Sequence, residues 1–128
     1  MRIAQINVTA ALSTGRIAVE LCRLAQRDGH QAILCHARDH APADVPSIVI
    51  GSRLDTCVHA GLSRLTDRAG FYSLRATHDF IRALERFDPE IIHLHNIHGS
   101  YLHLPTLFEY LKTKKVPVVW TLHDCWAY

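Results

Sequence analysis

Three short segments of the sequence carry residue types that could bind or activate a substrate, and the richest of them reads HLHNIHGSY, from His93 to Tyr101. On a strand, the first two histidines of this segment would point to the same face, because side chains alternate along a strand. The residues that follow them supply hydrogen-bond donors and acceptors suited to sugar hydroxyls. We select three as candidate sugar- or acceptor-binding residues: Asn96, His98 and Gly99.

Two alternatives stay open for the histidines of this segment. The pair His93 and His95 has the H-x-H spacing of a zinc site, and His98 could be a third ligand of a metal-dependent hydrolase. The segment lacks the acidic residue that usually completes such a site, so we assign no metal ligands. The two strand histidines could instead be hydrogen-bonded residues of the core.

The second segment reads TLHDCWAY and contains His123 and Asp124 directly after an apolar run. Neighbouring His and Asp side chains can orient one another, or they can act separately on substrate hydroxyls. A Ser-His-Asp hydrolase is disfavoured, because no G-x-S-x-G segment follows any predicted strand.

The third segment is VTAALSTG, from Val8 to Gly15, which leads into a helix at Arg16. Ser13, Thr14 and Gly15 are small and would leave backbone N–H groups free to receive an anion such as a diphosphate. Arg16 would add positive charge to a bound phosphate. Alternatively, the Ser and Thr only cap the helix, and the Arg is a solvated residue of its first turn.

These segments must be positioned by alternating strands and helices. Runs rich in Ile, Val and Leu predict mostly buried strands over Arg2–Asn7, Gln31–Ala37, Ser47–Gly51, Glu90–His95 and Pro117–His123. Apolar residues at helical spacing predict helices over Arg16–Asp28, Leu54–Leu65 and Phe80–Phe87, and a last helix from Pro105 to Lys115.

The alternation predicts an α/β fold: a Rossmann-like, doubly wound parallel sheet with helices on both faces. In such sheets ligands collect beyond the carboxyl ends of the strands. All three segments follow a predicted strand, so we expect them to lie at one edge of the sheet.

Composition sets the class of protein. The 128 residues suit one domain, and 48% hydrophobic with 20% charged residues argues against disorder. A formal net charge of +2 is too small to indicate nucleic acid as the main partner. No stretch approaches a membrane span, the first residues lack the apolar region of a signal peptide, and the four cysteines form no C-x-x-C pair. We expect a cytoplasmic protein.

Four segments also carry a family resemblance: MRIAQIN, STGRIAVELCRLAQRDGH, FDPEIIHLHNIHG and VPVVWTLHD. In order and spacing they resemble the N-terminal domain of the group 1 glycosyltransferases, which have the two-domain GT-B fold. The likeness covers essentially the whole chain. The order and spacing of the segments are similar to those of bacterial members that build surface polysaccharides. It implies transfer of a sugar from a nucleotide diphosphate sugar to a glycan or lipid-linked acceptor, without a cofactor or an obligatory metal.

The resemblance also implies roles for residues and partners. Residues 1–128 would be the N-terminal, acceptor-side domain, inactive without the C-terminal donor-binding domain that this chain lacks. The family's loop after the first strand reaches the donor diphosphate, and in this sequence it corresponds to Ser13, Thr14, Gly15 and Arg16. The family's catalytic histidine corresponds to His123. We place Asp124 with Asn96, His98 and Gly99 on the sugar side. The full-length protein would contact the inner face of the membrane peripherally, and a non-catalytic nucleotide-binding domain remains an alternative.

Overall fold

Five strands form one parallel sheet in the order β3-β2-β1-β4-β5 in the computed structural model, which describes residues 1–125 of the chain. The strands are β1 (Arg2–Ile6), β2 (Gln31–His36), β3 (Ser47–Val49), β4 (Ile91–Leu94) and β5 (Val118–Trp120). The helices are α1 (Leu12–Arg27), α2 (Arg53–Thr66), α3 (Leu74–Phe87) and α4 (Leu104–Lys114). Within residues 1–125, no helix combines the length and the apolar character needed to cross a membrane.

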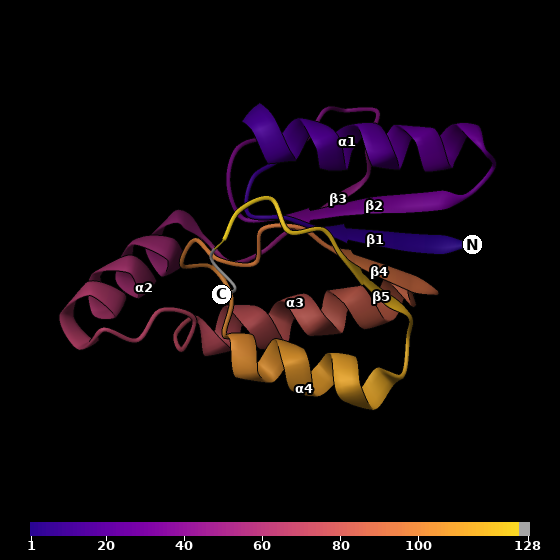
Figure 1. Cartoon of the computed structure of the whole chain (residues 1–128). Coiled ribbons are helices and arrows are strands. Elements are labelled where there is room, and N and C mark those ends of the chain that lie inside the picture. Colours follow the sequence, from indigo (N-terminus) through magenta and orange to yellow (C-terminus); the bar gives the residue numbers. More distant parts are fainter. Residues whose placement is uncertain (126–128) are drawn as a thin grey trace.

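Helices cover both faces of the sheet. Helix α1 lies on one face, and α3 and α4 lie next to each other on the opposite face (Figure 1). Right-handed crossovers explain this arrangement, because the chain moves one way across the sheet from β1 to β3 and the other way from β1 to β5. The prediction of an α/β, Rossmann-like, doubly wound parallel sheet is confirmed.

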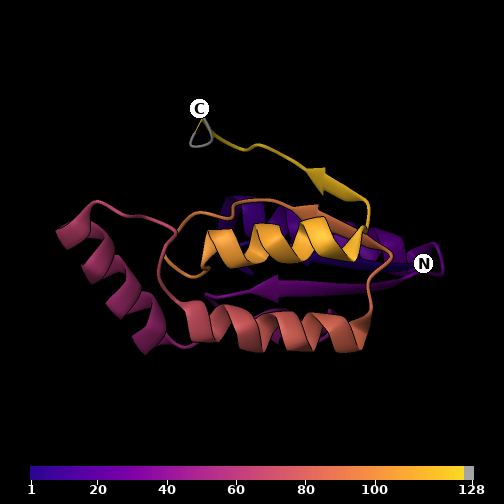
Figure 2. The same ribbon diagram turned by 90° about the horizontal axis from the view of Figure 1, so that it is seen from below.

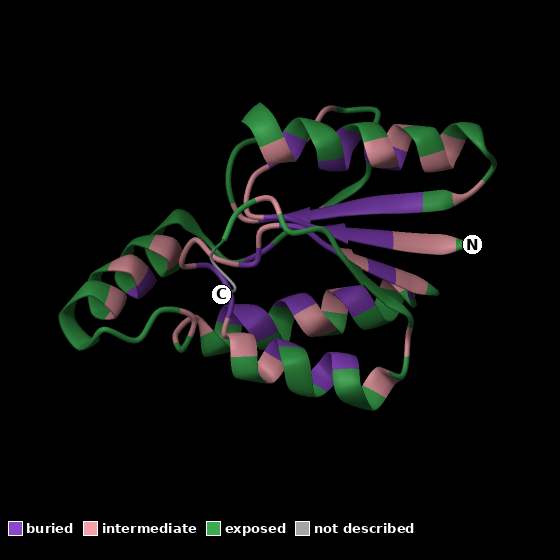
Figure 3. Cartoon of the chain, in the orientation of Figure 1, coloured by how far each residue is buried: buried purple, intermediate pink, exposed green. Residues whose placement is uncertain are grey.

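The core has an apolar layer on each face of the sheet (Figure 3). Under α1, residues Ala18, Val19 and Cys22 pack near Ala32 and Leu34 of β2. On the other face a larger cluster joins α3 and α4 to the central strands, and its members include Ile6, Ile33, Phe80, Leu84, Ile92, Leu94 and Leu107. Helices α1, α3 and α4 therefore each bury one apolar stripe, which holds the strand ends at fixed positions.

Helix α2 departs from the expectation that its apolar residues face the core. Leu54 and Leu65 are 72% and 82% exposed, and the helix projects away from the sheet in both Figure 1 and Figure 2. Its buried residue is His59, whose Nδ1 lies 2.8 Å from Ser73 Oγ and whose Nε2 accepts from the Gly70 backbone N–H at 3.3 Å. Polar contacts to the following loop therefore anchor the helix, and its periodic apolar pattern did not identify a core face.

The two edge strands are more exposed than the sequence suggested. The residues of β5, Val118, Val119 and Trp120, are 42%, 51% and 38% exposed, and Val49 of β3 is also exposed. Within residues 1–125 each of these strands has a neighbour on one side only. An apolar run at the edge of a sheet keeps part of its surface open, so the expectation of buried strands is wrong for β3 and β5.

The direction of the connections reverses between β1 and β4. The chain leaves β1 toward α1 on one face and leaves β4 toward α4 on the other, so the two loops diverge (Figure 1). This divergence creates the crevice in which ligands bind to open α/β sheets. Because Ile6 is the register partner of Leu94, the next residues, Asn7 and His95, meet at this crevice.

A glycine at the start of α1 generates a stability prediction. A Cβ on Gly15 would lie 2.8 Å from the carbonyl carbon of Ala10 and 3.0 Å from the carbonyl oxygen of Thr9. These are backbone atoms, so we expect Gly15→Ala to lower the free energy of unfolding by about 1–3 kcal/mol. Gly61→Ala in α2 is the matched control, because a Cβ there meets nothing within 4 Å. We expect it to raise the stability by about 0.5–1 kcal/mol. Urea unfolding measures both, and equal effects would contradict the packing argument.

Candidate functional site

Asn7 joins the loops that follow β1 and β4. Its side chain is fully buried at the end of β1. Its Nδ2 donates to the Thr9 carbonyl oxygen at 2.9 Å and to Thr14 Oγ1 at 3.2 Å. Its Oδ1 accepts from the backbone N–H of Asn96 at 3.2 Å. A buried amide with these partners fixes the beginning of α1 relative to the end of β4.

The loop after β2 joins the same edge through Arg38. Its guanidinium donates to the carbonyl oxygen of Gly99 at 2.8 Å, and its own carbonyl accepts from the Ala10 N–H at 3.1 Å. Thr9 donates through its hydroxyl to the carboxylate of Asp39. The ends of β1, β2 and β4 therefore belong to one hydrogen-bonded cluster, with an arginine at its centre.

A chain of polar side chains crosses the sheet from β1 to the segment after β5. The side chain of Gln5 is buried, and its Oε1 lies 2.8 Å from His95 Nε2. The other ring nitrogen of this histidine, Nδ1, lies 2.9 Å from His123 Nε2. The two imidazoles are nearly parallel, with centroids 5.2 Å apart. The candidate catalytic His123 is thus connected to the buried centre of the sheet.

His93 stands beside this chain, on the same face of the sheet as His95, as predicted. The two ring centroids lie 4.2 Å apart, and His93 Nε2 lies 2.8 Å from Thr121 Oγ1. Burial lowers the pKa of His93 and lowers that of His95 further, to about 3, with smaller contributions from the neighbouring histidines. Both rings are therefore neutral at physiological pH. The interpretation as a hydrogen-bonded core residue fits the buried His95, whereas His93 is only half-buried.

His98 and Asp124 form a second pair at the same edge. His98 Nε2 lies 2.8 Å from Asp124 Oδ2, and both side chains are partly exposed. His123 contacts His95 instead of its neighbour in sequence. Of the two arrangements that the sequence left open, the structure therefore has His123 and Asp124 engaged with separate partners.

The candidate residues line a small hollow of about 10 Å³ beyond the ends of β4 and β5. Its walls are His95, Asn96, Ile97, His98, Trp120, Leu122, His123 and Asp124. A space of that size holds about one water molecule, not a sugar. Gly99 takes no part in the lining. Its φ is 113°, and a Cβ at this position would lie only 2.8 Å from Val8, so the backbone conformation and the close packing here favour glycine. The hollow at this edge is therefore too small to enclose a sugar by itself.

The first loop differs from the sequence-based expectation. Helix α1 begins at Leu12, with Ala11 as N-cap and no side-chain cap. Ser13 and Thr14 consequently lie inside the first turn, and the interpretation of them as caps of a helix starting at Arg16 is wrong. The reason is that Asn7 and the Thr9 hydroxyl hold the loop, so that the helix starts earlier. The first N–H groups of α1 lack intrahelical acceptors, as at any helix start.

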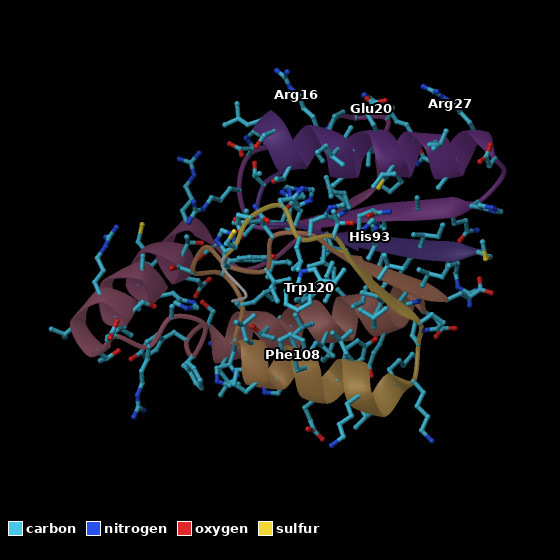
Figure 4. The ribbon with its side chains drawn as sticks, in the orientation of Figure 1. Arg16, Glu20, Arg27, His93, Phe108 and Trp120 are labelled. Atoms are coloured by element: carbon cyan, nitrogen blue, oxygen red, sulfur yellow. The ribbon has the colours of Figure 1, made fainter. Side chains whose placement is uncertain are left out.

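Arg16 is not directed at the crevice. It points away from the sheet on the solvent side of α1, as do Glu20 and Arg27 (Figure 4). These residues line a shallow apolar surface with Ile17 and Leu24. Among the four candidate phosphate-binding residues, the structure brings Ser13, Thr14 and Gly15 to the loop that Asn7 holds, and leaves the Arg16 side chain outside it.

A larger hollow, of about 460 Å³, lies away from these residues, between β3, the start of α2 and α3. Its carboxylates are already engaged, because Asp55 forms a capping box with Ser52 and Asp79 pairs with Arg82. In the described part of the chain, no three His, Cys, Asp or Glu side chains are grouped so that they could hold a metal ion. The histidine rings at the crevice stack and hydrogen-bond instead.

Sequence reasoning missed three residues of this edge: Gln5, Asn7 and Arg38. The first two are polar residues in an otherwise apolar strand, which is a signal of a buried hydrogen-bonded site. Arg38 had no such signal, because only the fold brings the loop after β2 against Gly99.

The family model described as Glycosyltransferase Family 4 matches residues 14–128. The chain belongs to this family. A comparison with curated proteins gives no match. His95, His123 and the residues beyond β4 therefore lie within the matched range, which begins in the first turn of α1, whereas the loop after β1 precedes it.

Two solved structures resemble this family 4 domain. They are the glycosyltransferase VinC in complex with DTDP, with 16% identity and a TM-score of 0.62, and the Streptomyces sp. SF2575 glycosyltransferase SsfS6, with 17% and 0.61. Each match covers 95% of this chain but only 34% and 39% of the respective solved chain. The likeness establishes the fold, and the chain spans little more than a third of these structures.

The first residue of α1 generates a second stability prediction. Leu12 has a φ of 56°, in the left-handed region, and its side chain is 69% exposed. Because that conformation strains residues with a Cβ by about 1–2 kcal/mol, we expect Leu12→Gly to raise the free energy of unfolding by about 0.5–1 kcal/mol. Leu54→Gly is the matched control: it changes an equally exposed leucine with ordinary φ in the first turn of α2 and should lower stability. Urea unfolding distinguishes them, and destabilisation by Leu12→Gly would refute the strain.

Burial of His95 generates a prediction about pH. Its pKa falls from 6.5 to about 3 on folding. Between these two pH values the unfolded chain binds a proton at this ring that the folded chain excludes. Stability should therefore fall as the pH is lowered from about 6.5 toward 4.5. We expect His95→Gln to make this fall shallower and exposed His40→Gln to leave it unchanged. Urea unfolding at a series of pH values measures the slopes, and identical slopes would contradict the assignment.

Proposed function

We propose that this domain is the N-terminal, acceptor-side half of a group 1 glycosyltransferase that moves a sugar from a nucleotide diphosphate sugar to a glycan or lipid-linked acceptor. The observation that carries the proposal is the bond of His123, in a family 4 domain, to His95, which follows β4 at the crevice where the connections reverse. Ligands of doubly wound sheets bind at such a crevice. The resemblance of its sequence segments to bacterial members that build surface polysaccharides favours such a product.

His123 is the proposed catalytic residue. One ring nitrogen is engaged by His95, and its Nδ1 has no partner within residues 1–125. A histidine held in this way can hydrogen-bond a hydroxyl of the donor sugar and stabilise the charge that develops as the nucleoside diphosphate departs. Asn96, His98 and Asp124 line the same hollow and supply donors and acceptors for sugar hydroxyls.

The donor diphosphate would meet the first turn of α1. Backbone N–H groups at Ser13 and Thr14 carry the partial positive charge of a helix N-terminus, which favours anions. Gly15 allows the loop after β1 to pack closely beneath them. Arg38, which is exposed beside this loop, supplies a full positive charge, and Arg16 would have to change its side-chain conformation to add a second.

A second domain would complete the site. The hollow of about 10 Å³ cannot enclose a sugar, and the matches cover only 34% and 39% of the solved glycosyltransferase chains. We therefore assign the donor-binding half to a C-terminal domain of the same polypeptide. The proposed reaction needs no cofactor and no resident metal, and the enzyme would work in the cytoplasm, in peripheral contact with the inner face of the membrane.

The test is a sugar-transfer assay on the full-length polypeptide with a panel of nucleotide diphosphate sugars. We expect one donor to be consumed and His123→Ala to lower kcat/KM by about 100-fold or more, because a donor to developing charge is lost. His30→Ala, at the opposite end of the sheet, should keep wild-type activity. The 128-residue chain alone should consume no donor.

Each outcome has a separate meaning. Full activity of His123→Ala would show that the catalytic assignment is wrong. Stoichiometric zinc in the purified protein, without consumption of any donor, would favour the metal-dependent hydrolase. Nucleotide binding without turnover by the full-length protein would favour a non-catalytic binding domain.

A further inference from the structure

We propose that Gln5 and His95 are positioning residues that hold His123 with its proton on Nε2, so that an unprotonated Nδ1 faces the open side of the crevice. The chemical role of this nitrogen rests on the proposed function, whereas the position of the proton does not. The argument follows three hydrogen-bonding groups from the interior of the sheet outward.

Gln5 determines the tautomer of His95. The carboxamide oxygen Oε1 can only accept a hydrogen bond, and it lies 2.8 Å from His95 Nε2. The proton of the His95 ring must therefore be on Nε2. Gln5 and His95 are both buried, and a hydrogen bond is electrostatically stronger in such surroundings than in water.

His95 transmits this choice to His123. A neutral imidazole carries one N–H, so the Nδ1 of His95 has only a lone pair and must accept. The atom 2.9 Å away is His123 Nε2, which must be the donor. In its neutral form His123 then has no proton on Nδ1. Within residues 1–125 this nitrogen has no partner, so it can accept a hydrogen bond from a substrate hydroxyl.

The surroundings prevent His95 from turning over. Its backbone N–H donates to the Ile6 carbonyl at 2.9 Å, and its carbonyl accepts from Trp120 Nε1 at 3.1 Å. Its ring lies between those of His93 and His123, at centroid distances of 4.2 and 5.2 Å. A ring flip would break both ring hydrogen bonds, which would leave buried polar atoms without partners.

The side chains that face the His95 ring carry no negative charge. The residue from β1 is the neutral Gln5, the residue from β4 is His93, and the residue after β5 is His123. None of these carries a negative charge that would stabilise an imidazolium at His95. When His123 binds a second proton, its Nε2–H bond to His95 is unchanged and its Nδ1 becomes a donor. The same geometry thus serves either protonation state.

The direct test is an NMR measurement of the tautomers in the 128-residue chain with ¹⁵N-labelled histidine rings. At pH 7.5 we expect both His95 and His123 to carry their protons on Nε2. A His123 proton on Nδ1, or a mixture of the two tautomers, would overturn the proposal. This measurement is made on the wild-type chain, so it does not depend on whether a variant folds.

Gln5→Glu tests the relay itself. A carboxylate at this position still accepts from His95 Nε2 but stabilises the charged ring, so the pKa of His95 should rise. Once charged, His95 donates from Nδ1, and His123 must move its proton to Nδ1. We expect the tautomer of His123 to invert wherever His95 is charged and His123 is neutral. His36→Gln, which alters another buried histidine that has no bond to His123, is the matched control and should leave the tautomer unchanged.

The full-length enzyme supplies the kinetic readout. We expect Gln5→Glu to lower kcat by about tenfold or more and to move the pH profile, with KM for the donor little changed, because the wrong tautomer is costly in histidine catalysis. If His123→Ala abolishes transfer while Gln5→Glu alters neither the tautomer nor the profile, the relay is wrong and the proposed function stands. If the tautomers are as stated and Gln5→Glu inverts them, the relay stands even where His123→Ala remains active.

Discussion

The buried amide of Asn7 is the constraint on which the site depends. A buried polar side chain must be hydrogen-bonded, and the groups that satisfy Asn7 come from the loop after β1, the first turn of α1 and the residue that follows β4. These bonds hold two loops together at the point where they leave the sheet in opposite directions. The crevice is therefore fixed by hydrogen bonds before any ligand binds.

The chemistry of this edge is dominated by neutral histidines. Burial lowers the pKa values of His93 and His95, so these rings act through the direction of their hydrogen bonds and not through charge. Positive charge at the crevice comes instead from Arg38, whose guanidinium is held against Gly99. Under the proposed function, the hydrogen-bonding groups would lie near the sugar of a nucleotide sugar and the cation near its phosphates.

The openness of the site agrees with a second wall. The hollow beside His123 is too small for a sugar, and apolar residues of β5 and α2 remain exposed beside or near this edge. Apolar side chains at helical or strand spacing predict a helix or a strand, but they do not say what covers them. This is why α2 and β5 were expected to be buried, while the structure of residues 1–125 leaves them open.

The sequence by itself determined the class of fold and the edge at which to look. Its alternating apolar runs and amphipathic segments were enough to predict a doubly wound parallel sheet, because side-chain periodicity is a local property. It also identified His98, His123 and Asp124 as residues of one edge, since all follow a strand. Only the tertiary structure decided the pairing. His95 bonds to Gln5, 90 residues away, and His123 bonds to His95 instead of Asp124, because strand order and register, not position in the chain, determine which side chains meet.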